Sequence, residues 1–499
     1  MPDEESDIVQ AFESGAVRGG FGPARRIDTH LSHVFLATDR AVKIKRRVKL
    51  PFADFTTLEA RHRTLMAELD INRRTAPRLY LDVMPISHVA AGWALGGTEP
   101  AQDWALIMRR FEDGALFDEM AGSGKLTIEL IEATAKRIAA FHRSLAPSEH
   151  PADAEYYLAI IDELVQTEAD GARRLGINRS SQALFSALGR SLEMARALIE
   201  ARAARGHVRR GHGDLHLRNI CLFDGEPTLF DALEFDEGLA TNDTLYDFAF
   251  LLMDLTHRGL AAHANVALNR YWDASGEDEE ALGGLAFFMA LRAAVRMAVS
   301  VEMGALREAD QYLALGMDLL RPVRPRLVAL GGLSGTGKSA VARALAHELD
   351  GVCGARLLRT DVVRKQLAGV GAEARLPNSS YAPQQRLDVY RVLAERAAAA
   401  LSSTSVVADA TFREAEARAA IAHAKGAAPF IGLWLSAPQS VRLARVRARE
   451  GDASDATVEI AAAQTEPDQL DDNWRRLNAA DDLGKVLARA RDSLGLKAP

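Results

Sequence analysis

The sequence predicts two domains of different fold class, an N-terminal α+β domain and a C-terminal α/β domain with a parallel sheet. The chain has 499 residues, more than a single core usually spans. Short alternating segments before residue 112 predict an antiparallel sheet, and helical segments follow to about residue 320. After residue 326, apolar strands alternate with helices, which is typical of a parallel sheet.

The N-terminal domain, predicted over residues 1–322, divides into a small lobe at about 20–112 and a helical lobe at about 113–322. In the small lobe, VFLATDRAVKIKRRV predicts two strands around a turn at residues 38–40. A helix is expected over about residues 57–75, and LYLDVMPI and WALIMRRF predict two further strands. In the helical lobe, ICLFDGEPTLF predicts a hairpin that turns at Asp224-Gly225.

The C-terminal domain is predicted over residues 323–499. Prolines and arginines in RPVRPR mark an exposed linker before it. The strand RLVAL then feeds a glycine-rich loop and the helix SAVARALAHEL, and SVVADA and FIGLWL predict further buried strands.

Composition favours a cytoplasmic protein. The net charge is −7, so the chain as a whole has no general attraction to nucleic acid or anionic membranes. Its only two cysteines, Cys221 and Cys353, give no disulfide framework. Arg292 and Arg296 interrupt the apolar run that starts at Gly284, which favours a buried helix over a membrane span.

The glycine-rich loop GLSGTGKS matches the pattern G-x-x-x-x-G-K-[ST] between a strand and a helix. Its backbone N–H groups and the helix N-terminus attract phosphate, its lysine reaches the β- and γ-phosphates, and its serine ligates Mg²⁺. The alternative is a chance glycine-rich turn, which the two correct flanks make improbable. The predicted ATP-binding residues are Gly332, Leu333, Ser334, Gly335, Thr336, Gly337, Lys338 and Ser339.

Three further segments predict chemistry at this loop. Asp361 in RTDVVRK is placed to accept a proton from a hydroxyl, and Asp409 in VVADATF is placed to support Mg²⁺. Arg445 and Arg449 share a helix face in VRLARVRAREGDASDA, where they would close over the phosphates. The alternative for this arginine run alone is a solvated helix face.

Together these segments resemble the small P-loop kinases grouped with gluconate kinase, zeta-toxin kinases and polynucleotide 5′-hydroxyl kinase. The resemblance covers about residues 326–499. It implies Asp361 as the base and Arg445 and Arg449 as lid residues. It does not identify the acceptor, because acceptors in this group range from sugars to nucleic-acid ends.

In the N-terminal domain, GHGDLHLRNICLF places Asp214 five residues before Asn219. Phosphoryl transfer to a hydroxyl needs a carboxylate to accept the proton and ligands for Mg²⁺. Asp214 would be that base, and Asn219 would ligate the metal together with Asp231 from LFDALEF.

This pattern resembles the aminoglycoside phosphotransferase family, which shares the protein-kinase fold, over about residues 20–300. The resemblance implies Ser32 beside the phosphates and the backbone around Met108 beside adenine. It implies Lys43 as the phosphate lysine, with Lys45 as the rival, and a helical glutamate to hold it, either Glu68 or Glu59.

Three nearby side chains are expected to hold the loop that carries Asp214 in position: Asp247, His212 and His216. Asp247 would orient it. The histidines are expected to brace it, and zinc binding is their alternative role.

The whole arrangement resembles bacterial fusion proteins described as bifunctional phosphotransferase/ATP-binding proteins. We therefore expect an ATP- and Mg²⁺-dependent kinase with two active sites that phosphorylates hydroxyls of small molecules. Residues 150–205 lack the acidic cluster that a polycationic aminoglycoside would need. Two alternatives stay open: the P-loop domain is a nucleotide switch for the N-terminal kinase, or it phosphorylates a nucleic-acid 5′-hydroxyl. The sequence does not indicate the oligomeric state.

Overall fold

The computed structural model describes residues 4–50, 53–150, 152–234, 236–371, 374–448 and 457–496. The chain divides into two compact units. The first unit comprises residues 1–137, 144–152 and 205–251, and the second comprises residues 138–143, 153–204 and 252–499.

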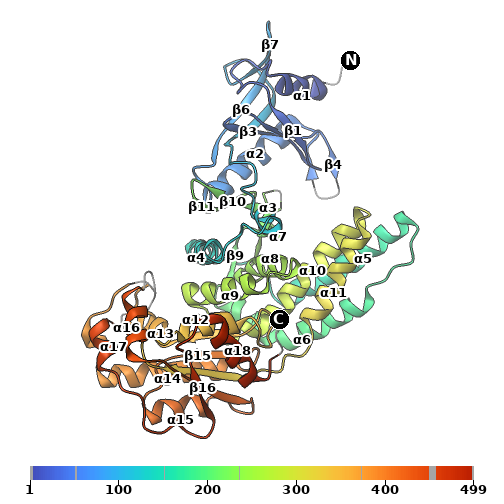
Figure 1. Ribbon diagram of the computed structural model, residues 1–499. Helices are drawn as coiled ribbons and strands as arrows, with labels where there is room; N and C mark the ends of the chain where they lie inside the picture. The colour runs from blue at the N-terminus through green and yellow to red at the C-terminus, as the bar shows by residue number, and fades with distance from the viewer. Residues whose placement is uncertain are drawn as a thin grey trace. The chain divides into compact units, whose positions relative to one another are not determined.

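The first unit contains the predicted antiparallel sheet, whose six strands run in the order β1-β2-β3-β8-β6-β7 (Figure 1). Helix α2 packs against β6 and β8 and begins after Thr57, whose side chain accepts the backbone N–H of Ala60. The elements of this lobe are α1 (Glu4–Ser14), β1 (Arg25–Asp28), β2 (Ser32–Leu36), β3 (Arg40–Lys45), β4 (Lys49–Leu50), β5 (Ala53–Asp54), α2 (Leu58–Arg73), β6 (Tyr80–Val89), β7 (Gly92–Leu95) and β8 (Ala101–Arg109).

The rest of the first unit carries the loop that contains Asp214. The predicted hairpin pairs β10 with β11, and Asp224 and Gly225 both have positive φ, at 50° and 78°, as a tight two-residue turn requires. The elements here are α3 (Phe117–Gly122), α4 (Ile128–Ser144), β9 (Val208–Arg210), η1 (Leu217–Asn219), β10 (Ile220–Phe223), β11 (Glu226–Leu229), α7 (Glu237–Ala240), β12 (Thr241–Asp243) and α8 (Thr244–His257). Helices α4 and α8 contribute residues to both units.

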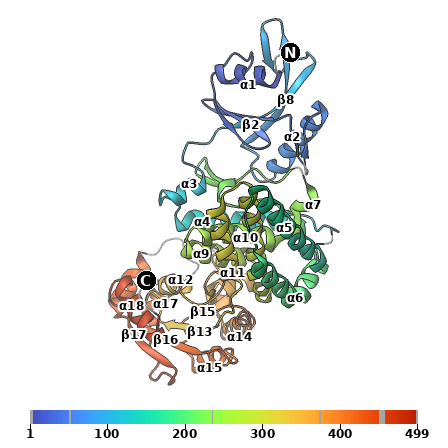
Figure 2. The same ribbon diagram turned by 90° about the vertical axis from the view of Figure 1, so that its right-hand side faces the viewer.

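The helices of the second unit surround α10, which packs against α5, α6 and α11 (Figure 2). By length and composition, residues 279–302 could cross a membrane, but 72% of the most apolar 18-residue stretch within them is buried inside the protein. Arg292 is buried and Arg296 pairs with Glu308, so the segment forms the expected core helix. The bounds are α5 (Ala154–Leu175), α6 (Gln182–Ala204), α9 (Ala261–Ser275), η2 (Glu279–Gly284), α10 (Leu285–Glu302) and α11 (Leu306–Leu319).

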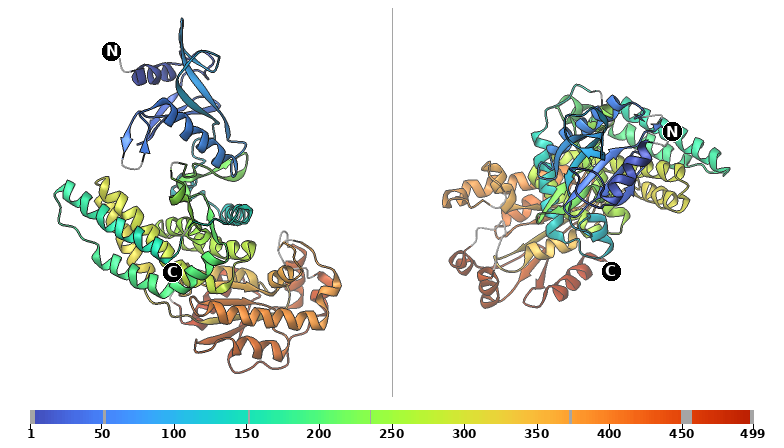
Figure 3. Two further views of the ribbon diagram at one scale, coloured as in Figure 1. Left: turned by 180° about the vertical axis from the view of Figure 1, so that it is seen from behind. Right: turned by 90° about the horizontal axis from the view of Figure 1, so that it is seen from above.

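The remainder of the second unit, coloured orange to red in Figure 3, is built around a five-stranded parallel sheet. Its strand order is β14-β15-β13-β16-β17. Helices α12 and α18 pack together on one face, and α14 and α15 pack together on the other (Figure 1). The bounds are β13 (Leu327–Gly332), α12 (Lys338–Ala346), β14 (Arg356–Arg359), α13 (Thr360–Leu367), η3 (Asn378–Tyr381), α14 (Pro383–Ala400), β15 (Val406–Asp409), α15 (Ala415–His423), β16 (Phe430–Ser436), α16 (Gln439–Arg447), α17 (Val458–Ala463), β17 (Trp474–Asn478) and α18 (Leu483–Leu494). The two sheets confirm the predicted fold class.

The outer strand β14 pairs with β15 on one side only, and side chains of α9 supply hydrogen bonds on its other side. Asn265 Nδ2 donates to the carbonyls of Cys353 and Ala355 at 2.7 and 2.9 Å. Asn269 Oδ1 accepts the backbone N–H of Leu357 at 2.6 Å. These amides take the place of a neighbouring strand, so buried backbone groups keep partners.

Buried charges reinforce this attachment. Arg356 is 1% exposed, and both its Nε and Nη2 donate to Glu279, at 2.9 and 3.2 Å. Its Nη2 also donates to Asp273 at 2.8 Å, and its Nη1 to Asn269 at 3.0 Å. Burial would lower the pKa of Arg356, but the two carboxylates outweigh it and raise that pKa. Removing one member would leave buried charge without its partner.

Asn269→Ala should therefore destabilise the second unit. The change leaves the N–H of Leu357 without its side-chain acceptor, which costs about 1–3 kcal/mol for a buried group. Thermal unfolding of the full-length chain should show a lower Tm. Asn178→Ala, at an exposed position of the same unit, should leave Tm unchanged. Equal Tm values for the two variants would contradict this account of the edge strand.

Candidate phosphotransfer sites

The loop that carries Asp214 is held in place by Asp247 on α8. The Asp247 carboxylate accepts the backbone N–H groups of His212 and Gly213 at 2.8 and 2.9 Å. Gly211 allows this approach, because a Cβ on it would collide with the Asp247 carboxylate. Asp247 thus occupies the orienting position that its sequence context predicted.

Asp214 and Asn219 lie together within this loop. Asn219 Nδ2 donates to the carboxylate of Asp214 at 2.7 Å and to its carbonyl at 2.9 Å. His216 Nε2 lies 3.3 Å from the Asp214 carboxylate, and His212 Nε2 lies 3.0 Å from the carbonyl of Phe230. Both histidines contact the loop, and no group of three or more His, Cys, Asp or Glu side chains across the described residues could hold a metal ion.

Asp231 lies directly after the hairpin in an uncommon backbone conformation, with φ at 58°. Left-handed conformations of residues other than glycine are kept where surrounding contacts demand them, often at functional sites. The backbone N–H of Asp231 donates to the Tyr80 hydroxyl at 3.0 Å, and the next N–H, of Ala232, donates to Asn72 at 2.9 Å. These contacts aim the Asp231 carboxylate at Lys43, 2.8 Å away.

Both candidate lysines contact Glu68, which is fully buried. Lys43 Nζ lies 2.6 Å from Glu68 Oε1, and Lys45 Nζ lies 2.8 Å from Glu68 Oε2. Burial alone would raise the pKa of Glu68, but the two ammonium groups outweigh it and lower that pKa. The alternative helical residue, Glu59, is exposed. Glu68 is therefore the helical glutamate that the structure brings to the lysines.

The two lysines differ in their second partner. Lys45 is 1% exposed and bonds Glu234 at 2.7 Å, whereas the Lys43 side chain is 13% exposed and bonds Asp231. Burial raises the pKa of Glu234. Lys43 thus lies beside the candidate metal ligand, and Lys45 belongs to a buried ion pair that the sequence analysis missed. Glu234 stands three residues after Asp231 in LFDALEF, which was the available signal.

The remaining predicted residues of the first unit lie in its sheet. Ser32 begins β2 and is buried, and its hydroxyl has no hydrogen-bond partner within the described part of the chain. Met108 lies in β8, with Ala41 opposite it on β3 and Tyr80 opposite it on β6. The backbone of β8 at Met108 is thus flanked by strands on both sides, one residue before the strand ends at Arg109. Phosphate contact by Ser32 and adenine contact by the backbone at Met108 remain predictions.

In the second unit, the P-loop joins β13 to α12 as predicted. Gly335 has φ at 84° and lies against the backbone of Arg442, where a side chain would not fit. Gln464 holds the loop from outside, because its side-chain oxygen accepts the N–H of Ser334 at 2.7 Å. Ser339 Oγ donates to Asp409 at 2.6 Å, which brings the two predicted Mg²⁺ ligands together.

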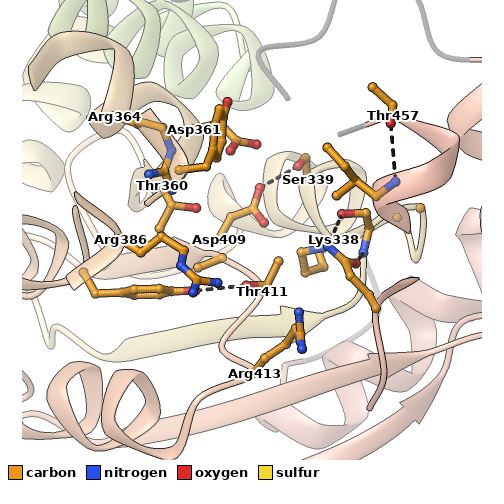
Figure 4. Close-up of a pocket in the computed structure, with 18 of the residues that line it drawn as sticks. Lys338, Ser339, Thr360, Asp361, Arg364, Arg386, Asp409, Thr411, Arg413 and Thr457 are labelled. Atoms are coloured by element: carbon orange, nitrogen blue, oxygen red, sulfur yellow. Dashed lines mark hydrogen bonds between the residues drawn. The ribbon is translucent and has the colours of Figure 1, made fainter. Parts of the chain in front are cut away.

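A pocket of 840 Å³ opens in front of this loop (Figure 4). It is lined by Lys338, Ser339, Asp361 and Asp409, so the structure brings the predicted base to the predicted phosphate loop. Burial and the nearby Asp409 raise the pKa of Asp361, although Arg359 acts against this. A raised pKa makes a carboxylate a better proton acceptor.

The arginine-rich helix α16 carries Arg445, one of the two predicted lid residues. Arg445 lines the pocket, but its guanidinium donates to the carbonyls of Thr336, Ala479 and Asp481 at 3.3, 2.8 and 3.0 Å. In this arrangement Arg445 braces the P-loop, which spacing alone did not reveal. Arg449 lies outside the described residues, since the description of this segment ends at residue 448. A lid role for either arginine remains a prediction.

Lys43→Met and Lys45→Met should separate the two lysines. Lys43→Met should lower ATP affinity at the first site and should lower Tm less than Lys45→Met does, because Glu68 keeps Lys45 as a partner. Lys45→Met strands Glu234 in a buried position and should destabilise the first unit by about 3–5 kcal/mol. Binding of an ATP analogue to a Lys338→Ala background, together with thermal unfolding, checks both effects. If Lys45→Met lowers the ATP affinity and Lys43→Met causes the larger loss of Tm, Lys45 is the phosphate lysine.

The comparisons with known proteins extend to both halves of the chain. A family model described as an AAA domain matches residues 327–468. A gluconokinase structure from Sinorhizobium meliloti is similar over 35% of this chain and 98% of its own, at 20% identity and a TM-score of 0.25. A choline/ethanolamine kinase family protein from Mesorhizobium loti is similar over 64% of this chain and 95% of its own, at 16% identity and a TM-score of 0.38.

Relatives that match most of this chain show its family. "Uncharacterized protein Rv2004c" of Mycobacterium tuberculosis and "Uncharacterized protein Mb2027c" of Mycobacterium bovis are each 32% identical to this chain over 456 residues. The matched region takes in 87% of this chain and 88% of each relative. The chain therefore belongs to the same family as these mycobacterial proteins.

Proposed function

We propose that the chain is a kinase with two active sites, each of which transfers the γ-phosphoryl group of ATP to a hydroxyl of a small molecule. One observation carries the proposal. In each site a predicted metal-binding carboxylate is bonded to a second predicted site residue: Asp231 to the phosphate lysine Lys43, and Asp409 to Ser339, the predicted Mg²⁺ ligand of the P-loop. A structural loop has no need of this pairing, whereas phosphoryl transfer needs both groups close to the same phosphates.

The donor sets fit Mg²⁺, which is bound in such sites through one or two protein oxygens together with phosphates and water. Asn219 and Asp231 would hold it in the first site, and Ser339 and Asp409 in the second. When bound, the ion neutralises charge on the phosphates. The protein's own groups do the rest: Lys43 or Lys338 positions the phosphates, and Asp214 or Asp361 orients the acceptor hydroxyl and takes its proton.

Two further observations support this reading of the chain. Asp361 lines the P-loop pocket, and a simple nucleotide switch would not require a carboxylate of raised pKa there. Both cysteines are buried and unpaired, which supports a cytoplasmic setting.

Label transfer from γ-labelled ATP tests the proposal. Full-length wild type, Asp214→Asn and Lys338→Ala are incubated with Mg²⁺ and a fractionated metabolite and RNA extract. Each variant should lose a different labelled product, because loss of the base or of the phosphate lysine disables only its own site. For Asp214→Asn the rate of product formation should fall about 10²–10⁴-fold.

Lys425→Ala, at an exposed position of the second unit, is the matched control and should retain both products. If Lys338→Ala only changes the rate at which the Asp214-dependent product forms, the P-loop part is a nucleotide switch instead. If the Lys338-dependent product is an RNA, the P-loop site phosphorylates nucleic-acid ends.

A further inference from the structure

The P-loop pocket is rich in positive charge. Its lining includes six cationic side chains against three carboxylates. The cations are Lys338, Arg343, Arg364, Arg386, Arg413 and Arg445, and the carboxylates are Asp361, Asp409 and Glu414.

The six cations come from two sides of the sheet. Lys338, Arg343 and Arg445 lie on α12 and α16, the helices that follow β13 and β16. The other three lie on α13, on α14 and in the loop after β15, which are the elements next to the base Asp361. In the strand order β14-β15-β13-β16-β17, the strands β14 and β15 that lead to the second group lie on the side of β13 away from β16. The second group therefore lies where an acceptor must approach Asp361.

Arg413 is presented to the pocket by a strained backbone. The residue before it, Phe412, has φ at 48°, which is rare for a bulky side chain. Its N–H donates to the Tyr390 hydroxyl at 3.2 Å, and the buried Arg418 donates to the carbonyls of Phe412 and Arg413 at 3.2 and 2.9 Å. Strain held by several contacts is typical of a functional position.

The Arg413 side chain is directed into the pocket from this loop (Figure 4). Its Nε is buried and has no hydrogen-bond partner within the described residues. A buried guanidinium nitrogen without a partner is costly, and an anionic ligand would satisfy it.

Arg364 is the second arginine near Asp361 that the structure holds in a fixed position. It is 8% exposed, its guanidinium lies 4.6 Å from the centre of the Tyr381 ring, and its Nη1 donates to the carbonyl of Ser380 at 3.0 Å. It lies on α13, three residues after Asp361, so it is one helical turn from the base. Arg386 is half-exposed, and its Nη1 lies 3.5 Å from the Glu414 carboxylate. Its exposure indicates that it lies at the outer part of the pocket.

We infer that the acceptor of the P-loop site is a small hydroxyl compound, not a polynucleotide, that already carries a negatively charged group, a carboxylate or a phosphate. Arg364 and Arg413 bind that group and so bring the hydroxyl to Asp361, with Arg386 near the entrance. Planar guanidinium groups suit both anions, because they donate two parallel hydrogen bonds. In the reaction the acceptor oxygen bonds to the γ-phosphorus, the bond from that phosphorus to the β,γ-bridging oxygen breaks, Asp361 takes the hydroxyl proton, and ADP leaves. This inference rests on the proposed kinase activity of the P-loop site.

The test uses the full-length chain with Asp214→Asn, so that the first site is silent. A small-metabolite extract, filtered to remove polynucleotides, is separated on an anion exchanger at pH 7. Transfer from γ-labelled ATP is then measured with the bound and the unbound fraction, with Lys338→Ala as the blank. Lys338-dependent product should arise from the bound fraction. Phosphatase treatment of that fraction before the assay removes a phosphorylated acceptor and spares a carboxylate.

Substitutions then connect the acceptor to the arginines. Arg413→Gln and Arg364→Gln should each raise KM for the active fraction about 10- to 100-fold, with KM for ATP nearly unchanged. Arg413→Lys should restore part of the affinity, because it keeps the charge and loses the paired hydrogen bonds. Arg391→Gln, at an exposed position of α14, is the matched control and should have no effect.

Lys338-dependent product from the unbound fraction would overturn the inference and leave the kinase proposal standing, with a neutral or cationic acceptor. Product that forms only after the polynucleotides are added back would also overturn the inference, because it would identify a nucleic-acid acceptor. A fall in kcat with unchanged acceptor KM in the Arg413 and Arg364 variants would assign these arginines to the transferring phosphoryl group instead. No Lys338-dependent product with any fraction would refute the kinase proposal for this site and the inference with it.

Discussion

The P-loop site depends on how the edge strand β14 is held. Because β14 has a neighbouring strand on one side only, Asn265 and Asn269 of α9 complete its hydrogen bonding, and Arg356 anchors it through Glu279 and Asp273. Helix α13 starts directly after β14 and carries Asp361 in its first turn. Helix α9, which comes before the P-loop in the sequence, thus helps to position the base by holding β14. Separating the C-terminal residues at the predicted boundary would expose these buried charges.

Both candidate sites keep their reacting groups in place through strained or buried arrangements. Asp231 and Phe412 adopt left-handed conformations, each directly beside groups that face a site, and each is held by a tyrosine hydroxyl. Glu68 is buried between two lysines, which fixes Lys43 before any nucleotide arrives. Such preorganisation is what phosphoryl transfer requires, because the protein contributes mainly position and charge to that reaction.

The sequence predicted those parts of the sites that local patterns determine. The P-loop, the Asp214–Asn219 spacing and the hairpin that leads to Asp231 depend on residues close in sequence, and the structure has the loop and the hairpin where they were expected. The pair Lys45–Glu234 joins residues 189 positions apart, and the partners of Arg445 come from two separate segments, the P-loop and the stretch after β17. Such contacts depend on tertiary packing, so a single sequence did not reveal them. The attachment of α9 to β14 was missed for the same reason.

The central claim is that one chain holds two separate ATP sites, and the number of nucleotides bound per chain tests it most directly. Titration calorimetry with a non-hydrolysable ATP analogue and Mg²⁺ should give two sites in the wild type. It should give one in Lys338→Ala, one in Asp231→Asn, and none in the double variant. Asparagine tolerates the left-handed backbone at position 231, so Asp231→Asn should remove the negative charge and leave the local fold intact. A single site in the wild type, abolished by Lys338→Ala alone, would contradict the account.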